Sequence, residues 1–240
     1  AGNFKDASNA YEFIIKVDPK DIFAYIGLAT TYIREKNFAG AIKVLEDCRL
    51  QGLENPGIYL ALGFAYTSLD KFDKAEEVLN KAKGLYPDDS RIYFYLGVLC
   101  DKINNKEEAE KFFRRTIELD PRSADAYNYL GYGFVEQSKN LDEEVELIKK
   151  ALEIDPANGA YIDSLGWAYF KLGKIDEALS EVEKASKLLD DPVIMDHLGD
   201  IYDKKGNFIK AKESWEKSLK IDPANLKVKE KLKKLKKGSE

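Results

Sequence analysis

The fold is decided by residues 93–121, which read YFYLGVLCDKINNKEEAEKFFRRTIELDP. Within this stretch Tyr93, Leu96 and Cys100 have the i, i+3, i+7 spacing that places apolar side chains on one face of a helix. An Asn-Asn pair follows as a turn signal, and the closing proline is a residue that ends one helix and opens the next. The stretch therefore predicts two helices joined by a short turn.

The same two-helix pattern returns along the chain about every 34 residues. Leucines equivalent to Leu96 occur at spacings of 33–35 residues, as Leu28, Leu62, Leu130, Leu165 and Leu198. A glycine follows each of these leucines except Leu28. The second helix of a unit carries a small residue with a large one four positions later, and the small residues are Ala41, Ala75, Ala109, Ala178 and Ala211. Small residues let two helix backbones approach closely, so we expect the two helices of each unit to pack tightly.

On these residues the chain resembles the tetratricopeptide repeat family, whose unit has Leu-Gly and Tyr on its first helix, Ala and Phe on its second, and a closing Pro. The stretch at 161–169, YIDSLGWAY, is similar to repeats of bacterial arrays. The resemblance implies an all-α fold, a right-handed superhelical solenoid in which the first helices line the concave wall. It implies six repeats over residues 21–224, after the lone second helix of a truncated first repeat at 1–20 and before a basic capping helix and tail at 225–240. Because the chain starts inside a repeat, we expect the parent protein to continue upstream or a second chain to cover this end.

The composition argues against several classes of function. A net charge of −5 provides no overall attraction for nucleic acid. One histidine, one methionine and two cysteines leave few side chains for acid–base or metal chemistry, and the sequence contains no phosphate-binding loop or nucleophile elbow. No apolar run approaches the ~18 residues that span a bilayer. We therefore expect no catalysis, no cofactor, no metal site and no transmembrane segment, in a protein suited to the cytoplasm or to a bacterial periplasm.

The candidate site is the side of the first helices that faces about 180° away from the leucine stripe. An ordinary solvent face would be charged, but here it is mainly apolar: Phe23, Ile26, Leu60, Phe64, Phe94, Tyr95, Val98, Tyr129, Tyr132, Trp167 and Phe170. The polar members of the same face are Arg91, Asn128, Asp163, Asp196 and Asp200. A contiguous apolar patch usually marks an interaction surface. The sequence therefore predicts a non-catalytic scaffold that captures an extended or helical peptide segment in an aromatic concave groove, acidic at its C-terminal end.

The polar members refine the expected ligand. Asn128 is expected to bond a peptide backbone amide, and Asp163, Asp196 and Asp200 to receive a basic residue or a free amino terminus. Many eukaryotic members of the family bind C-terminal carboxylates through Lys and Asn at these positions. This chain has mainly aromatics and aspartates there, which argues against a carboxylate clamp.

Alternatives remain open at this level. The aromatic side chains can instead bury one another, and the protein can be a homo-oligomeric structural module whose groove or N-terminal edge binds another copy. The fifth repeat has an extra residue in its turn at 137–141 and has Glu144 at its small position. We expect Glu144 to face solvent, because an unpaired buried carboxylate is costly; the alternative is a buried Glu144 bonded to a neighbour. His197 is expected at the edge of the groove, and the lysine run at 227–237 is expected to keep the terminal helix soluble rather than to bind an anionic surface.

Overall fold

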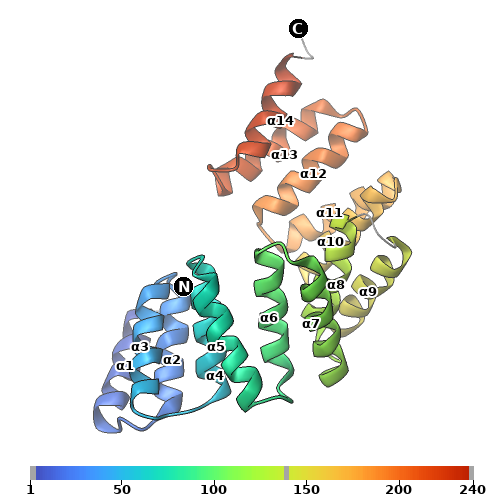
Figure 1. Ribbon diagram of the computed structural model, residues 1–240. Helices are drawn as coiled ribbons and strands as arrows, with labels where there is room; N and C mark the ends of the chain where they lie inside the picture. The colour runs from blue at the N-terminus through green and yellow to red at the C-terminus, as the bar shows by residue number, and fades with distance from the viewer. Residues whose placement is uncertain (1–3, 138–140, 238–240) are drawn as a thin grey trace. The chain divides into compact units, whose positions relative to one another are not determined.

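The computed structural model describes residues 4–137 and 141–237, and every regular element in these ranges is an α-helix (Figure 1). The chain divides into two compact units, residues 1–121 and 122–240. The helices of the N-terminal unit are α1 Phe4–Val17, α2 Ile22–Arg34, α3 Phe38–Leu50, α4 Pro56–Ser68, α5 Phe72–Leu85, α6 Ser90–Lys102 and α7 Lys106–Leu119. Those of the C-terminal unit are α8 Ala124–Gln137, α9 Leu141–Ile154, α10 Gly159–Lys171, α11 Ile175–Leu188, α12 Pro192–Lys204, α13 Phe208–Ile221 and α14 Leu226–Lys237.

The helices pack as repeating pairs, as the sequence predicts. In the N-terminal unit the pairs are α2 with α3, α4 with α5, and α6 with α7, and α1 packs against α2. In the C-terminal unit they are α8 with α9, α10 with α11, and α12 with α13, and α14 packs against α13. Successive first helices also contact each other, α2 with α4 and α4 with α6 in one unit, α8 with α10 and α10 with α12 in the other. Each unit is thus a helical repeat solenoid in which the first helices form one row.

Local sequence sets where the helices begin and turn. The side chains of Asp21, Asn37 and Asn105 each accept a hydrogen bond from a backbone N–H in the first turn of the helix that follows. The tight turn inside a repeat uses one residue in the left-handed region, as at Asn104 (φ 61°) and Gly173 (φ 76°). These turns return the chain so that both helices of a repeat bury their apolar faces together.

The repeated glycines act through close packing. A Cβ atom on Gly97 would lie 2.6 Å from Phe113 Cε1, and one on Gly199 would lie 2.4 Å from Trp215 Cδ1. Both contacts are too short for any side chain, so the first helix can approach the large residue of the second helix only where it carries glycine. The expected close packing of the two helices of a repeat is confirmed.

Glu144 corrects one expectation. Its side chain is fully buried, and neither carboxyl oxygen has a hydrogen-bond partner among the residues described. Burial raises the pKa of this carboxyl to about 7, and the charge of Glu143 adds to the effect. The expected solvent-facing position is wrong, because Glu144 points inward as the small residues at the equivalent position of the other repeats do. The two helices are also close here: a Cβ on Gly131 of α8 would lie 3.1 Å from the backbone oxygen of Glu144. The extra residue expected in the preceding turn falls at 138–140, outside the described ranges.

None of the helices that the structure describes combines the length and apolarity needed to cross a membrane.

Candidate functional site

The first helices of the N-terminal unit carry partly exposed apolar side chains, mainly aromatic, which we call the aromatic face: Phe23, Phe64, Phe94, Tyr95 and Val98. Phe23 on α2 is 77% exposed and Phe64 on α4 is 37% exposed. The Phe64 ring packs edge-on against Tyr95, with the centroids 6.2 Å apart, and Tyr95 packs edge-on against Phe94 at 5.7 Å. Phe94 in turn lies 5.9 Å from the ring of the buried Phe113. The rings of Phe64, Tyr95 and Phe94 are therefore connected to the core and held in place before any ligand arrives.

Other predicted residues of this unit have different positions. Leu60 is buried in the core, and Ile26 is half-buried against it, at the point where a Cβ on Gly57 would lie 3.0 Å from Ile26 Cδ1. The expectation that Leu60 lies on an open surface is thus wrong, because the neighbouring first helices approach closely here. Arg91 is exposed and pairs with Asp89, the N-cap of α6, at 2.6 Å, which holds the pKa of the Asp89 carboxyl below its usual value.

In the C-terminal unit Trp167 is buried rather than exposed. Its indole is parallel to the ring of His197 on α12, with the centroids 3.9 Å apart, and to the ring of Phe170 at 4.9 Å. His197 Nδ1 lies 2.9 Å from Asp163 Oδ2, and both of these residues are also buried. The expectations that Trp167 and Asp163 face a ligand, and that His197 sits at a groove edge, are therefore wrong. Sequence periodicity missed this cluster because it joins residues about one repeat apart, on α10 and α12.

The acidic positions of α12 are already paired within the chain. Lys231 of α14 places its Nζ 2.6 Å from Asp196 Oδ1 and 2.6 Å from Asp200 Oδ1, and Trp215 Nε1 donates to Asp200 Oδ1 at 3.1 Å. Burial raises the pKa of Asp200, with Lys231 opposing the shift. The basic group that the sequence leads us to expect from a partner is thus supplied by the protein's own terminal helix.

The remaining predicted residues lie on α8 and α10. Tyr129 is 39% exposed, whereas Tyr132 and Phe170 are half-buried against the core that contains Trp167. Asn128 is half-buried, and its Oδ1 is covered and accepts no hydrogen bond within the described part of the chain. The structure therefore does not present this oxygen to solvent.

Metal ligands and reactive thiols are the two remaining kinds of site to consider in the described ranges. They contain no group of three or more His, Cys, Asp or Glu residues placed to hold a metal ion. Burial raises the pKa of both thiols, that of Cys48 to about 11, so both are protonated at neutral pH and are poor nucleophiles.

Comparison with known proteins agrees with this geometry. Family models described as tetratricopeptide repeat match residues 56–99, 90–123, 161–188 and 192–225, which together make up more than half of the chain. The chain belongs to the tetratricopeptide repeat family. Repeats of this family generally mediate protein–protein interaction and scaffolding and are typically non-catalytic, and this tetratricopeptide repeat protein has the corresponding architecture. No curated protein matches its sequence.

Several solved structures have a similar fold. A chain of the APC/C hetero-tetramer Cut9-Hcn1 is 16% identical with a TM-score of 0.86, over 97% of this chain and 46% of that one. A tetratricopeptide repeat protein from Parabacteroides merdae is 19% identical with a TM-score of 0.76, over 98% and 93%. The thermophilic protein TTC0263 from Thermus thermophilus is 21% identical with a TM-score of 0.66, over 75% and 98%. This tetratricopeptide repeat protein thus spans less than half of the first of these relatives, and at such identities the likeness is one of fold.

Proposed function

We propose that this protein is a non-catalytic scaffold that captures a peptide segment of a protein partner on its aromatic face. The observation that carries the proposal is the exposure of Phe64 beside the partly buried rings of Tyr95 and Phe94, in the same row of first helices as the exposed Phe23. Apolar side chains gathered on one row of helices in a protein of this family fit a docking surface better than an ordinary charged solvent face.

The energetics fit moderate affinity. Full burial of one such side chain contributes about 1.5–3 kcal/mol. Because the rings around Phe64 are already packed edge to face, little side-chain freedom is lost on binding. Two or three anchors can therefore offset the ordering of a peptide and give affinity on the order of micromolar. The ligand that fits is an extended segment or short helix with apolar anchors.

The proposed site does not include the acidic end. Asp196 and Asp200 both pair with Lys231, so a basic ligand group would have to displace or share an existing ion pair. Trp167 and Asp163 are covered by His197 and are assigned to packing.

The test is a selection of peptides from a random library on the wild-type protein, followed by affinity measurement with variants. We expect the double variant Phe23→Ala, Phe64→Ala to bind the selected peptides at least about tenfold more weakly. Phe208→Ala is the matched control, because this phenylalanine is 55% exposed but lies on α13, outside the aromatic face. Equal loss in both variants, or no loss in the double variant, would show that the aromatic face is not the docking surface.

A second candidate is self-association through the N-terminal edge. Phe13 and Val17 on α1 are 66% and 68% exposed, close in sequence to the exposed Phe23. Molar mass measured by light scattering over a wide concentration range separates the two functions. A stable dimer that Phe13→Asp converts to a monomer supports self-assembly, and a monomer at all concentrations excludes it.

A further inference from the structure

A tyrosine recurs at one position of the first helices, as Tyr25, Tyr59, Tyr93 and Tyr127. In three of these repeats a cation from the second helix lies over the ring. Lys81 Nζ lies 5.4 Å from the Tyr59 centroid, Arg115 Cζ lies 5.8 Å from that of Tyr93, and Lys150 Nζ lies 5.7 Å from that of Tyr127.

These three cations occupy the same repeat position, at spacings of 34 and 35 residues. The equivalent residue 34 positions before Lys81 is Asp47. The repeat that contains Tyr25 therefore has an acidic side chain where the others have a basic one.

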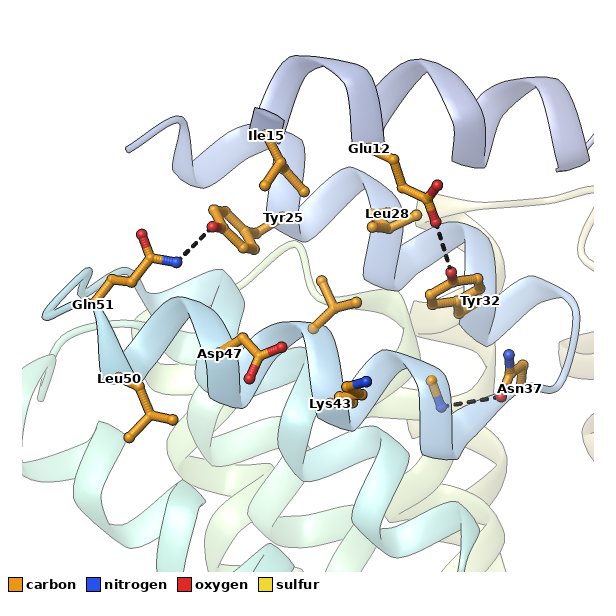
Figure 2. A pocket seen from close by; sticks show the side chains of 12 residues that line it. Glu12, Ile15, Tyr25, Leu28, Tyr32, Asn37, Lys43, Asp47, Leu50 and Gln51 are labelled. Atoms are coloured by element: carbon orange, nitrogen blue, oxygen red, sulfur yellow. Dashed lines mark hydrogen bonds between the residues drawn. The ribbon is translucent and has the colours of Figure 1, made fainter. Parts of the chain in front are cut away.

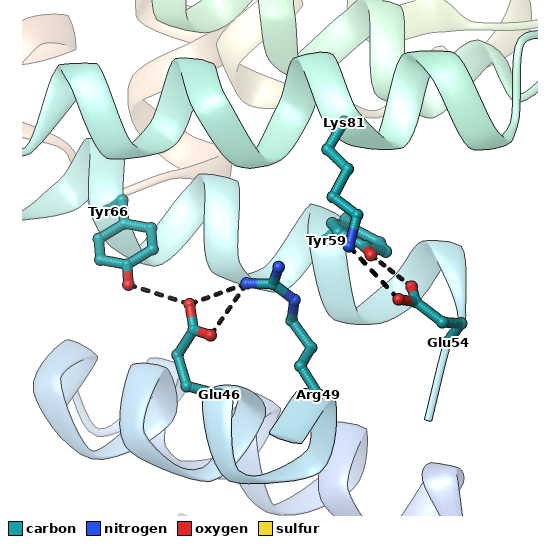
Figure 3. A network of polar contacts seen from close by, with 6 residues as sticks. All are labelled: Glu46, Arg49, Glu54, Tyr59, Tyr66 and Lys81. Carbon is teal, nitrogen blue, oxygen red and sulfur yellow. Dashed lines mark hydrogen bonds and ion pairs between the residues drawn. The ribbon is translucent and has the colours of Figure 1, made fainter. Parts of the chain in front are cut away.

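The surroundings of Tyr59 show how the cations fill the space between α3 and α5 (Figure 3). The Arg49 guanidinium lies 5.3 Å from the Tyr59 centroid and pairs with Glu46 at 2.9 Å. Glu46 also accepts a hydrogen bond from the Tyr66 hydroxyl at 3.2 Å. Lys81 pairs with Glu54 at 3.4 Å, so each cation is held by a carboxylate as well as by the ring.

One repeat earlier, half of this network is present and half is missing. The Tyr32 hydroxyl donates to Glu12 at 3.2 Å, as Tyr66 does to Glu46. The position of Arg49, however, is taken by Ile15, and the position of Lys81 by Asp47. The carboxylate of Glu12 and the two tyrosines remain, but the cations between them are absent, and Lys20 takes the position of Glu54.

The result is a cavity of about 630 Å³ between α1, α2 and α3 (Figure 2). Its lining combines acidic, phenolic and aliphatic groups, among them Glu12, Asp47, Tyr25, Tyr32, Ile15 and Leu28. In the part of the chain that the structure describes, the Asp47 side chain makes no hydrogen bond or ion pair, and the Glu12 side chain is bonded only by the Tyr32 hydroxyl. The one basic residue that lines the cavity is Lys43, so its lining carries a net negative charge.

We propose that this cavity binds an arginine or lysine side chain of a protein partner, in the place that Arg49 and Lys81 fill in the next repeat. The charged group pairs with Asp47, the carboxylate of Glu12 adds negative charge to the lining, and the alkyl stem packs on Ile15 and Leu28. Arginine fits better than lysine, because its planar guanidinium can bond one carboxylate through two N–H groups and stack on a ring at once. The aromatic face contributes no residue to this cavity, so the site is separate from the proposed function.

The test is a titration of the isotope-labelled protein with N-acetyl-arginine amide, followed by NMR of the backbone amides. N-acetyl-citrulline amide is the control ligand, because it has nearly the same shape but no charge. We expect saturable shifts around Asp47 and Gln51 with the arginine compound in the millimolar range, and at least about tenfold weaker binding of the citrulline compound.

The informative variant is Asp47→Lys, which gives this repeat the basic residue that the three equivalent positions carry. It should fold normally, which circular dichroism checks, and it should lose the response to arginine because its own ammonium fills the cavity. Asp47→Asn is the second variant and should weaken binding without filling the space, whereas Lys43→Ala should tighten it. Equal binding of arginine and citrulline compounds, unchanged binding by both Asp47 variants, or no response of the wild type would each overturn the proposal.

Discussion

The ring of His197 lies parallel to the indole of Trp167, with the centroids 3.9 Å apart and the planes inclined by 10°. This contact joins α10 to α12 and explains why the largest side chain of the predicted site is only 8% exposed. His197 also faces the buried carboxyl group of Asp163, so one residue both covers the indole and pairs with one oxygen of an acid.

We predict that His197→Ala lowers the free energy of unfolding by about 2–4 kcal/mol, because it removes the stacked ring and leaves Asp163 buried without its partner. His197→Asn, which can still donate to Asp163, should lose less. Urea denaturation followed by tryptophan fluorescence measures both changes. Equal losses in the two variants would mean that the hydrogen bond to Asp163 adds nothing. Peptide capture by the aromatic face should be the same in both variants as in the wild type.

Glu144 should make the protein less stable as the pH rises. Its pKa is raised to about 7 in the folded chain from an ordinary value of 4.5, so the folded state holds a proton that the unfolded state has released. This group therefore does not change the free energy of unfolding below about pH 4.5. Between about pH 4.5 and 7 the free energy of unfolding falls, by on the order of 2–3 kcal/mol in total, and above that range it levels off.

The matching experiment compares Glu144→Ala with Glu143→Ala in urea denaturation at pH 5 and pH 8. The first variant restores the small residue found in the other repeats and should be stabilised at pH 8, with a flatter pH dependence. The second removes an exposed neighbour and should keep most of the wild-type pH dependence. A Glu144→Ala protein with the wild-type pH profile would rule out this carboxyl as the source.

Lys231 should hold α14 on the C-terminal unit. Lys231→Met leaves Asp196 and Asp200 close together without their cation, and we expect a loss of about 1–3 kcal/mol and faster amide hydrogen exchange in α14. Lys233→Met is the control, because this lysine lies on the same helix but is exposed. Addition of Asp196→Asn to the Lys231→Met variant should recover part of the loss. Unchanged exchange in α14 would refute the assigned role.

Two glycines with opposite surroundings should respond in opposite directions to alanine. Gly199→Ala places a methyl group 2.4 Å from the Trp215 ring and should lower stability by about 1–3 kcal/mol. Gly84→Ala adds a methyl group in a helix with nothing within 4 Å and should raise stability by about 0.4–1 kcal/mol. Thermal denaturation of the two variants tests the pair. A tolerated Gly199→Ala would indicate that the two helices can separate more easily than their packing implies.

The sequence alone was sufficient to predict the repeating helices and their packing in pairs, because both depend on the spacing of residues close together in the chain. The i, i+3, i+7 stripes determine which face of a first helix is buried, and the glycines that follow the leucines meet the large residues of the second helices, as at Gly97 and Phe113. The exposed aromatic side chains of the N-terminal unit were found by the same periodicity, applied to the opposite face.

The burial of individual side chains on that opposite face was decided only by the tertiary structure. Trp167 and Asp200 lie on the helix face that periodicity predicts to be exposed. His197 nevertheless covers Trp167, and Lys231 forms an ion pair with Asp200. The cavity beside Asp47 likewise exists only because the side chains of α1 and α3 face each other across α2. Helical periodicity gives the direction of a side chain from its own helix, whereas its exposure and its charge partner depend on neighbouring helices up to about one repeat away in the sequence.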